Sequence, residues 1–245
     1  MEIPKEILLF AIGAIAGFMN VFAGGGSTLT LPVLIFAGLD AATANGTNRI
    51  AIFLQNVSGI SSFKNQKITG ARIALKYSLF TIPGAIIGAF YSIKIDDVWF
   101  ERILGIVMIG VVISLFQKRK GNPGLNETEK PGFFFYLSLF AIGFYGGFIQ
   151  VGIGFIIMGT LFHFLQTSLV RVNFYKLILV LIYTIPTILV FVFNDKINWA
   201  LGLSLAAGNM LGAWIAAHVT VKKGDKFIRY ILAVAIILMA IKLFL

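Results

Sequence analysis

The chain has 245 residues, of which 58% are hydrophobic and only 12% are charged. Soluble proteins carry about 25% charged residues, so this composition excludes an ordinary soluble domain and predicts a polytopic protein in a lipid bilayer. The formal net charge of +10 does not indicate a nucleic-acid partner, because the basic residues gather between apolar segments, as orientation by cytoplasmic Lys and Arg produces. The absence of cysteine excludes disulfides and thiolate metal sites.

Two related halves are predicted within a single transmembrane transporter domain, residues 1–245. The first repeat covers residues 1–117 and the second residues 133–245, and a charged segment with Gly and Pro, residues 118–132, forms a cytoplasmic linker. We expect an all-α fold of about eight to ten helical segments, since a spanning helix needs about 20 residues. Each repeat is expected to contain a glycine-broken, re-entrant-like helical hairpin and three transmembrane helices.

The first half opens with an apolar segment, residues 8–38, which is interrupted by GGGST at residues 24–28. At about 1.5 Å per residue, the arms Glu6–Ala23 and Ser27–Ala37 are too short to cross a core of about 30 Å with any margin. We therefore expect a broken hairpin, and the alternative is one long tilted helix. The remaining spans are expected at about residues 41–63, 73–93 and 98–117.

The second half repeats this order. Its apolar segment, residues 133–164, is interrupted by QVGIG at residues 150–154, and a polar patch follows at residues 165–176. The remaining spans are expected at about residues 177–193, 199–218 and 227–245. Broken apolar segments at corresponding positions of two halves are typical of transporters and indicate the binding site.

Charge predicts the orientation of the two halves. If each broken segment is a hairpin that enters and leaves on one side and three full spans follow it, most basic residues lie on one face, in the loops at residues 64–76, 118–130, 171–176 and 222–229. Because three crossings per half is an odd number, the second half is then inserted upside down relative to the first. This face is predicted to be cytoplasmic, with both termini outside.

An anion site is predicted where the two breaks approach the bilayer midplane, because glycines leave the backbone accessible and helix N-termini attract negative charge. The polar patches add amide and guanidinium donors that suit sulfite, sulfonate or carboxylate oxygens. The alternative is that Arg49 and Arg171 only anchor helix ends, and for Lys176 we expect this anchoring role. The candidate substrate-binding residues are Gly24, Gly25, Gly26, Ser27, Thr28, Asn45, Thr47, Asn48, Arg49, Gln55, Gln150, Gly152, Arg171 and Asn173.

The carboxylates, histidines and remaining glycines bear on the charge of the cargo, on catalysis and on helix packing. All ten carboxylates lie in predicted loops or at helix ends, which favours an anion over a cation as cargo. There is no pattern for a metal site, a catalytic triad or a nucleotide, so we expect neither a cofactor nor an enzyme. His163 and His218 are expected to be packed or interfacial residues. Close helix packing is expected to account for Gly13, Gly17, Gly84, Gly88, Gly143 and Gly212.

Four short motifs carry a family resemblance. They are GFMNVFAGGGS at residues 17–27, LPVL at 31–34, ANGTN at 44–48 and WFERILGIVMIG at 99–110. Together they resemble the TauE/SafE family of sulfite and sulfonate-type exporters. The resemblance implies a multi-pass permease in the plasma (inner) membrane of a prokaryote that moves small sulfur-containing anions. The second half departs from the family pattern at residues 151–154, where VGIG replaces a glycine run.

We therefore expect a secondary transporter or exporter of small sulfur-containing anions that works by alternating access. The alternatives are an anion channel of the same architecture and a permease for a small carboxylate. A membrane-embedded enzyme or sensor is disfavoured, because the sequence has neither a catalytic constellation nor an output domain. The sequence is also compatible with a homo-oligomer.

Overall fold

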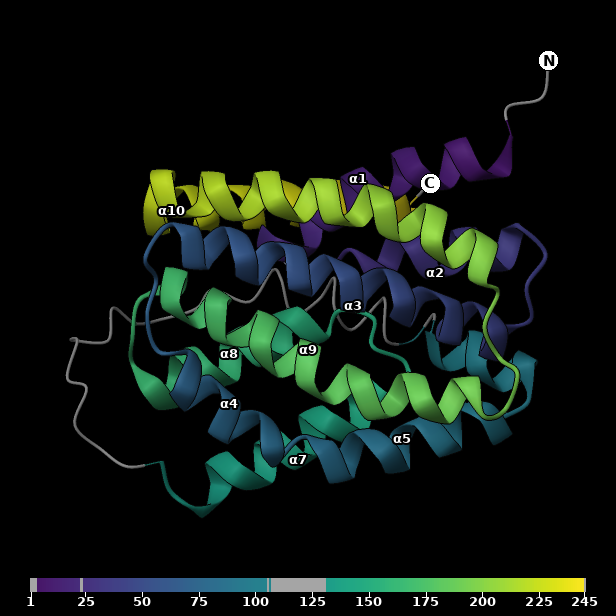
Figure 1. Cartoon of the computed structure of the whole chain (residues 1–245), viewed down its shortest axis with the longest axis horizontal. Helices are drawn as coiled ribbons and strands as arrows, with labels where there is room; N and C mark the ends of the chain where they lie inside the picture. Colours follow the sequence, from purple (N-terminus) through teal and green to yellow (C-terminus); the bar gives the residue numbers. More distant parts are fainter. Residues whose placement is uncertain (1–3, 23, 105, 107–130, 245) are drawn as a thin grey trace.

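The computed structural model describes the backbone of residues 4–22, 24–104, 106 and 131–244, with side chains as far as Lys222. All the secondary structure in these ranges is helical, which confirms the all-α class. Three of the described helices are long and apolar enough to cross a bilayer, and a bent pair of shorter helices could form a fourth span. The protein is accordingly a multi-pass membrane protein, and most of its helices run along the long axis (Figure 1).

The first predicted break is present. Helix α1 (Lys5–Phe22) ends before the glycine run, and α2 (Ser27–Phe36) begins after it. Gly24 has a φ of +78°, a left-handed conformation that favours glycine. Gly26 is also required for packing, because an added Cβ would lie 2.3 Å from the Ala16 carbonyl oxygen of α1. The chain therefore forms a helical hairpin, and the alternative of one long helix is wrong.

The second break is present as well. Helix α7 (Phe133–Phe148) and α8 (Ile153–Leu165) are separated by residues 149–152. Gln150 and Gly152 both have a left-handed backbone, with φ of +64° and +68°. A hairpin with an interrupted helix thus begins each of the two predicted halves, while the repeat itself and its inverted relation stay predictions.

Two long helices follow the hairpins, α3 (Ala41–Asn65) and α9 (Leu169–Val192). A side chain caps each one: Asp40 accepts a hydrogen bond from the Thr43 N–H at 3.0 Å, and Ser168 accepts one from the Arg171 N–H at 3.3 Å. Because the Ser168 cap starts α9 early, residues 171–176 are helical and do not form the predicted loop.

Two further boundaries differ from the prediction. The expected span at 73–93 is divided into α4 (Ala71–Leu79) and α5 (Ile82–Lys94), which meet at a 54° bend. Pro83 in the first turn of α5 explains the bend, since proline lacks an N–H and its ring clashes with the preceding turn.

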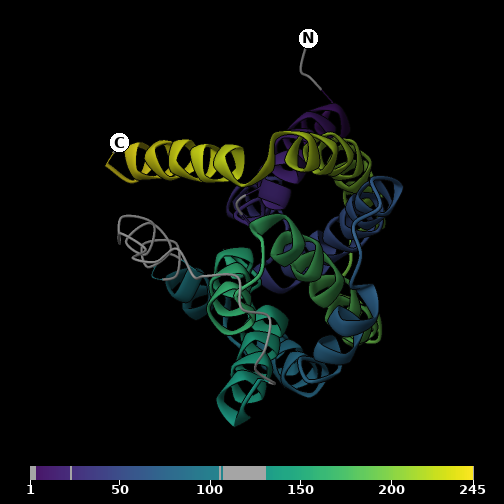
Figure 2. The same cartoon turned by 90° about the vertical axis from the view of Figure 1, so that its left-hand side faces the viewer.

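Helix α10 (Trp199–Phe244) is helical throughout, so residues 222–229 do not form the predicted loop, although the yellow C-terminal part of the helix turns sharply away from the rest (Figure 2). That segment holds no proline, and its single glycine costs only about 1 kcal/mol in a helix.

Residues 97–104 are also helical. The rest of the expected span at 98–117 lies outside the described residues, apart from residue 106, as does the linker except for residues 131–132.

The first arm of each hairpin packs against a helix from the other half. Helix α1 lies along α10 and α7 lies along α5, and Figure 2 shows the two pairs at opposite sides of the molecule. Glycines line both contacts, and an added Cβ at any of them would come within 2.0 to 2.4 Å of a backbone oxygen across the interface. These glycines are Gly13, Gly17, Gly84, Gly88, Gly143, Gly147, Gly208 and Gly212. The packing role predicted from the sequence is confirmed for all the glycines to which it was assigned.

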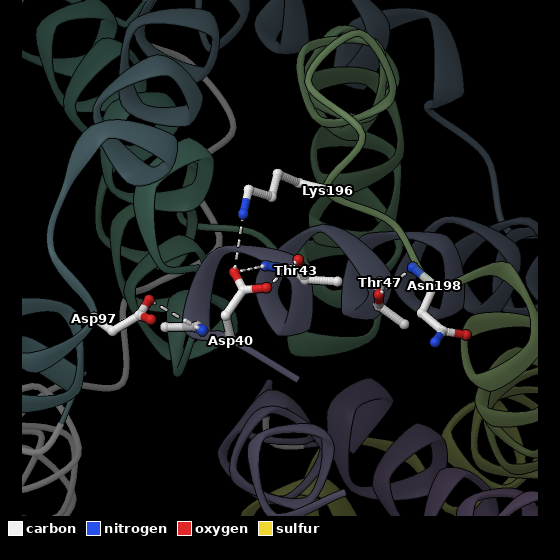
Figure 3. A network of polar contacts seen from close by, with 7 residues as sticks. Asp40, Thr43, Thr47, Asp97, Lys196 and Asn198 are labelled. Carbon is white, nitrogen blue, oxygen red and sulfur yellow. Dashed lines mark hydrogen bonds and ion pairs between the residues drawn. The ribbon is translucent and has the colours of Figure 1, made fainter. Parts of the chain in front are cut away.

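Polar contacts tie the start of α3 to the loop before α10 and to the first residue of the helical segment 97–104 (Figure 3). The Lys196 ammonium lies 3.3 Å from Asp40, and the Ala41 N–H donates to Asp97 over 3.3 Å. Burial would raise the pKa of the Asp40 carboxyl, but hydrogen bonds from Thr43 and Lys196 outweigh it, so this pKa is below its ordinary value. These contacts hold together the loops at the right-hand end of Figure 1, while the turns at residues 66–70 and 166–168 lie at the other end.

Candidate functional site

The two helix breaks touch each other. A Cβ on Gly24 would lie 2.3 Å from the Gly154 Cα, and a Cβ on Gly154 would lie 2.2 Å from the Gly24 Cα. Such a distance leaves room only for hydrogen on both residues. The predicted convergence of the breaks is therefore present, with backbone against backbone.

A small cavity lies beside this contact, lined by residues of both hairpins and of α3 and α9. The space at its centre is about 10 Å³, enough for about one water molecule. Any larger cargo requires the cavity to widen. The lining consists of Asn20, Ser27, Ile52, Gln55, Asn56, Gln150, Ile153, Gly154, Lys176, Leu177 and Val180.

Lys176 is the one charged side chain in this lining. It is 2% exposed, and its Nζ donates to the carbonyl oxygens of Asn20 and Val21, each over 2.8 Å. These carbonyls belong to the last turn of α1, and the Asn20 oxygen also accepts the Gly24 N–H over 2.9 Å. No carboxylate among the described residues pairs with Lys176. The expected anchoring role is wrong, because the early start of α9 places this side chain two turns inside the helix.

Arg49 makes similar contacts at the end of α7, the first arm of the second hairpin. It is completely buried, and its guanidinium donates to the Gly146 oxygen over 3.0 Å and to the Gly147 oxygen. It also donates to Thr187 and Asn45 and lies 4.8 Å from the centre of the Phe191 ring. Arg49 therefore caps the last turn of α7 as Lys176 caps that of α1. It is neither a helix-end anchor nor part of the cavity lining.

Amides complete the polar part of the cavity. The Gln55 side-chain oxygen accepts a hydrogen bond from Asn20 over 3.2 Å, and the Asn56 amide donates to the Ile52 oxygen over 2.7 Å. The Gln150 amide makes only long contacts, 3.4 Å to the Tyr183 hydroxyl and 3.5 Å to the Thr184 hydroxyl, and its second polar atom has no partner among the described residues. The unpaired atom is the side-chain oxygen, which only accepts, so Gln150 can serve an anion through its amide nitrogen, whose present contacts are long.

Two helix N-termini also face the cavity. Ser27 is the first residue of α2, and Ile153 and Gly154 begin α8, and all three line the space. The first N–H groups of a helix lack helical partners and carry the positive end of the helix dipole. Together with Lys176 they make the cavity electropositive, which suits an anion.

Three of the candidate residues predicted from the sequence line the cavity, namely Ser27, Gln55 and Gln150. Several others support the site from outside. Asn45 donates to the Ser92 hydroxyl and to the Phe148 oxygen, both over 2.7 Å, and so holds the end of α7. The candidates outside the lining are Gly24, Gly25, Gly26, Thr28, Asn45, Thr47, Asn48, Arg49, Gly152, Arg171 and Asn173.

Some of these outer candidates serve local structure. The Thr28 hydroxyl donates to the Gly25 oxygen and shapes the first break. Thr47 accepts the Asn198 N–H over 2.9 Å, near the end of the molecule drawn in Figure 3. Arg171 donates to the Thr167 hydroxyl over 3.1 Å at the start of α9.

The sequence interpretation missed Asn20, Asn56 and Lys176 as candidates. Asn20 could have been found from the sequence, because it is an amide within the apolar first arm of the hairpin. The signal for Lys176 was its spacing of 127 residues from Arg49, close to the 126 residues between Gly24 and Gln150, which begin the two breaks. His163 and His218 are both exposed and do not line the cavity.

A sequence model of the family described as sulfite exporter TauE/SafE matches residues 9–243. The chain belongs to this family. Its relatives include the "Probable membrane transporter protein" of Haemophilus influenzae, 25% identical over 99% of this chain and 96% of the relative. The chain is also 26% identical to the "Probable membrane transporter protein YfcA" of Escherichia coli K12, over 96% of this chain and 88% of the relative.

A third relative, the "Probable membrane transporter protein YunE" of Bacillus subtilis, is 24% identical over 97% of this chain and 96% of its own length. No solved structure matches the chain significantly. Family and relatives together support a membrane transporter, and the apolar helices agree with that function.

Proposed function

We propose that the protein is a secondary transporter of small sulfur-containing anions, such as sulfite or a sulfonate, and exports them across the plasma membrane. The anion binds in the cavity beside the two helix breaks. The observation that carries this proposal is Lys176, an ammonium buried at the cavity with no carboxylate partner among the described residues.

The charge of Lys176 favours an anionic ligand. An ammonium group has three donors. Two of them are used by the Asn20 and Val21 carbonyls, and the third faces the Met158 sulfur at 4.0 Å, a weak acceptor that an anionic oxygen can replace. Burying a charge without a counterion is costly, so an oxyanion that accepts the third hydrogen bond stabilises the site. The Ser27 hydroxyl and the Gln150 amide line the same cavity and can donate to the remaining oxygens.

The size of the cavity supports a carrier. A space for about one water molecule cannot hold sulfite, so the lining has to move before an anion enters. Movement of one hairpin relative to the other would open the cavity toward one side at a time. The alternatives are an anion channel of the same architecture and a permease for a small carboxylate. The family description, which names sulfite export, favours the sulfur anion.

Flux into proteoliposomes tests the proposal. We expect saturable movement of sulfite or methanesulfonate by the wild-type protein, and a loss of at least about tenfold in Lys176→Gln, because a hydrogen bond to a charged group contributes about 1.5–3 kcal/mol. Lys64→Gln is the matched control, since Lys64 is an exposed lysine at the end of α3. Wild-type flux in Lys176→Gln would contradict the site.

The same preparation separates the alternatives. Saturable flux of acetate without flux of sulfite or methanesulfonate would favour the carboxylate permease. Currents across a planar bilayer far above the turnover of a carrier would favour the channel. No saturable flux of any of these anions would overturn the transport proposal itself.

A further inference from the structure

We propose that Asn173 and Asn48 form transit sites for the anion on opposite sides of the central cavity. This inference rests on the proposed function. Asn173 is fully buried, and neither its side-chain nitrogen nor its side-chain oxygen has a hydrogen-bond partner among the residues that the structure describes. Asn48 is also fully buried. Its oxygen accepts a hydrogen bond from the Thr30 hydroxyl over 2.7 Å, but its nitrogen has no partner in the described ranges.

Unpaired buried amides are unfavourable in a folded protein. Each unsatisfied polar group costs about 1–3 kcal/mol, whereas an apolar side chain of similar shape avoids the cost. Proteins pair about 90% or more of such groups. The two asparagines therefore indicate a partner that is present only part of the time. Because an amide can present its N–H group to either side by rotation, it suits a passing anion.

The helical spacing places Asn173 next to the central cavity. It precedes Lys176 by three residues and Leu177 by four on α9, and both of these line the cavity. Residues three and four apart lie on the same face of a helix, about one turn from each other. Asn173 therefore lies on the cavity-facing stripe of α9, one turn closer to its N-terminus.

Asn48 has the same relation to the cavity on α3, where it precedes the lining residue Ile52 by four positions. Helices α3 and α9 pack against each other, and their colours in Figure 1 show that they run in opposite directions. One turn toward the N-terminus of α3 is therefore one turn toward the opposite end of the molecule. The two asparagines flank the cavity from its two sides.

This arrangement gives the anion a partner at each step. Leaving Lys176, the anion would move about 5 Å, the rise of one helical turn, before it meets an asparagine amide. A neutral amide donates a hydrogen bond but adds no charge, so it can receive the anion and release it again. Conduction requires such sites, which bind well enough to admit an ion and weakly enough to let it go.

The test compares Asn173→Ala with Asn173→Ser in proteoliposomes, because the two variants leave a similar void and differ in one hydroxyl donor. We expect Asn173→Ala to lower the maximal sulfite flux at least about tenfold and Asn173→Ser to keep it within about threefold of wild type. Sulfite affinity, measured by calorimetry on the purified protein, should stay within about twofold in both variants. The pair Asn48→Ala and Asn48→Ser should behave in the same way.

Equal flux in the Ala and Ser variants would overturn the transit role, since the hydroxyl would then make no difference. A parallel loss of affinity and flux would also overturn it, because the amide would belong to the central site or to the fold. Failure of the proposed function gives a different result, namely a wild-type protein that neither binds nor moves sulfite.

Discussion

Two buried cations hold the ends of the two hairpin arms. Arg49 from the first half donates to carbonyls of α7, and Lys176 from the second half donates to carbonyls of α1. A helix that ends inside the membrane has no water for its last carbonyls, so a side chain must supply the donors. The planar guanidinium has five donors in a fixed fork, whereas an ammonium has three on a flexible stem. Arg49 is accordingly enclosed by protein groups, while Lys176 borders the cavity.

Replacing Arg49 is expected to destabilise the fold. In Arg49→Ala the carbonyls of Gly146 and Gly147 lose their donor, at a cost of about 1–3 kcal/mol each, so the melting temperature should fall by several degrees. Thermal unfolding in detergent measures this change. Arg102→Ala is the control, because Arg102 is exposed and also lies on an aromatic ring, that of Trp99. Equal melting temperatures for the two variants would contradict the capping role.

The residue scale also shows the limit of reading a site from sequence. Arg49 was predicted to bind the anion because guanidinium suits oxyanions, but its terminal nitrogens are occupied by protein acceptors. Lys176 was assigned to a helix end, but it lies at the depth of the breaks. Whether a cation faces a cavity depends on where its helix begins and on which groups pack around it. Neither can be predicted from the few residues on each side of it in the sequence.

At the scale of elements, glycine accounts for two separate features. A glycine run interrupts the first hairpin and two separate glycines lie at the break of the second, while glycines four residues apart let α1 approach α10 and let α5 approach α7. Without a hydrophobic driving force between helices in lipid, such close backbone contact is a main source of association. Breaks and contacts could be predicted because both depend on glycine itself. The bend between α4 and α5 was missed although Pro83 was visible, since proline also occurs in straight first turns.

A methyl group at one of these contacts should weaken the fold. In Gly143→Ala the new Cβ would lie 2.0 Å from the Thr81 carbonyl oxygen on the facing chain segment, so α7 must shift, at a cost of about 1–3 kcal/mol or more. Gly132→Ala is the control near the start of the same helix, because no atom of the described residues lies within 4 Å of the place that its methyl group would take. A lower melting temperature for Gly143→Ala alone is expected, and equal stability of both variants would refute the tight contact.

At the scale of the whole molecule, the two halves depend on each other for the site. The cavity takes Asn20 and Ser27 from the first hairpin, Gln150 and Ile153 from the second, and Lys176 from α9. Neither half alone closes this space. The connections at the two ends of the molecule differ in charge in the sequence, and we predict that the end with residues 66–70 and 166–168 faces the cytoplasm.

Single cysteines can establish this orientation, because the natural chain has none. We expect Asn194→Cys to react with a membrane-impermeant thiol reagent added to intact cells, and Thr69→Cys to react only after the membrane is permeabilised. Both residues are exposed and lie in connections at opposite ends of the helices. The reverse labelling pattern would show that the charge-based orientation is wrong.

The sequence alone determined that the chain is helical, that it lies in a membrane and that two apolar segments are broken, because composition and glycine act locally. It also led to the TauE/SafE family through short motifs in the first half. Only the tertiary structure decided which polar groups meet. The contact of Gly24 with Gly154, the position of Lys176 at the cavity and the unpaired amides of Asn48 and Asn173 within the described ranges all arise from the packing of segments far apart in the chain.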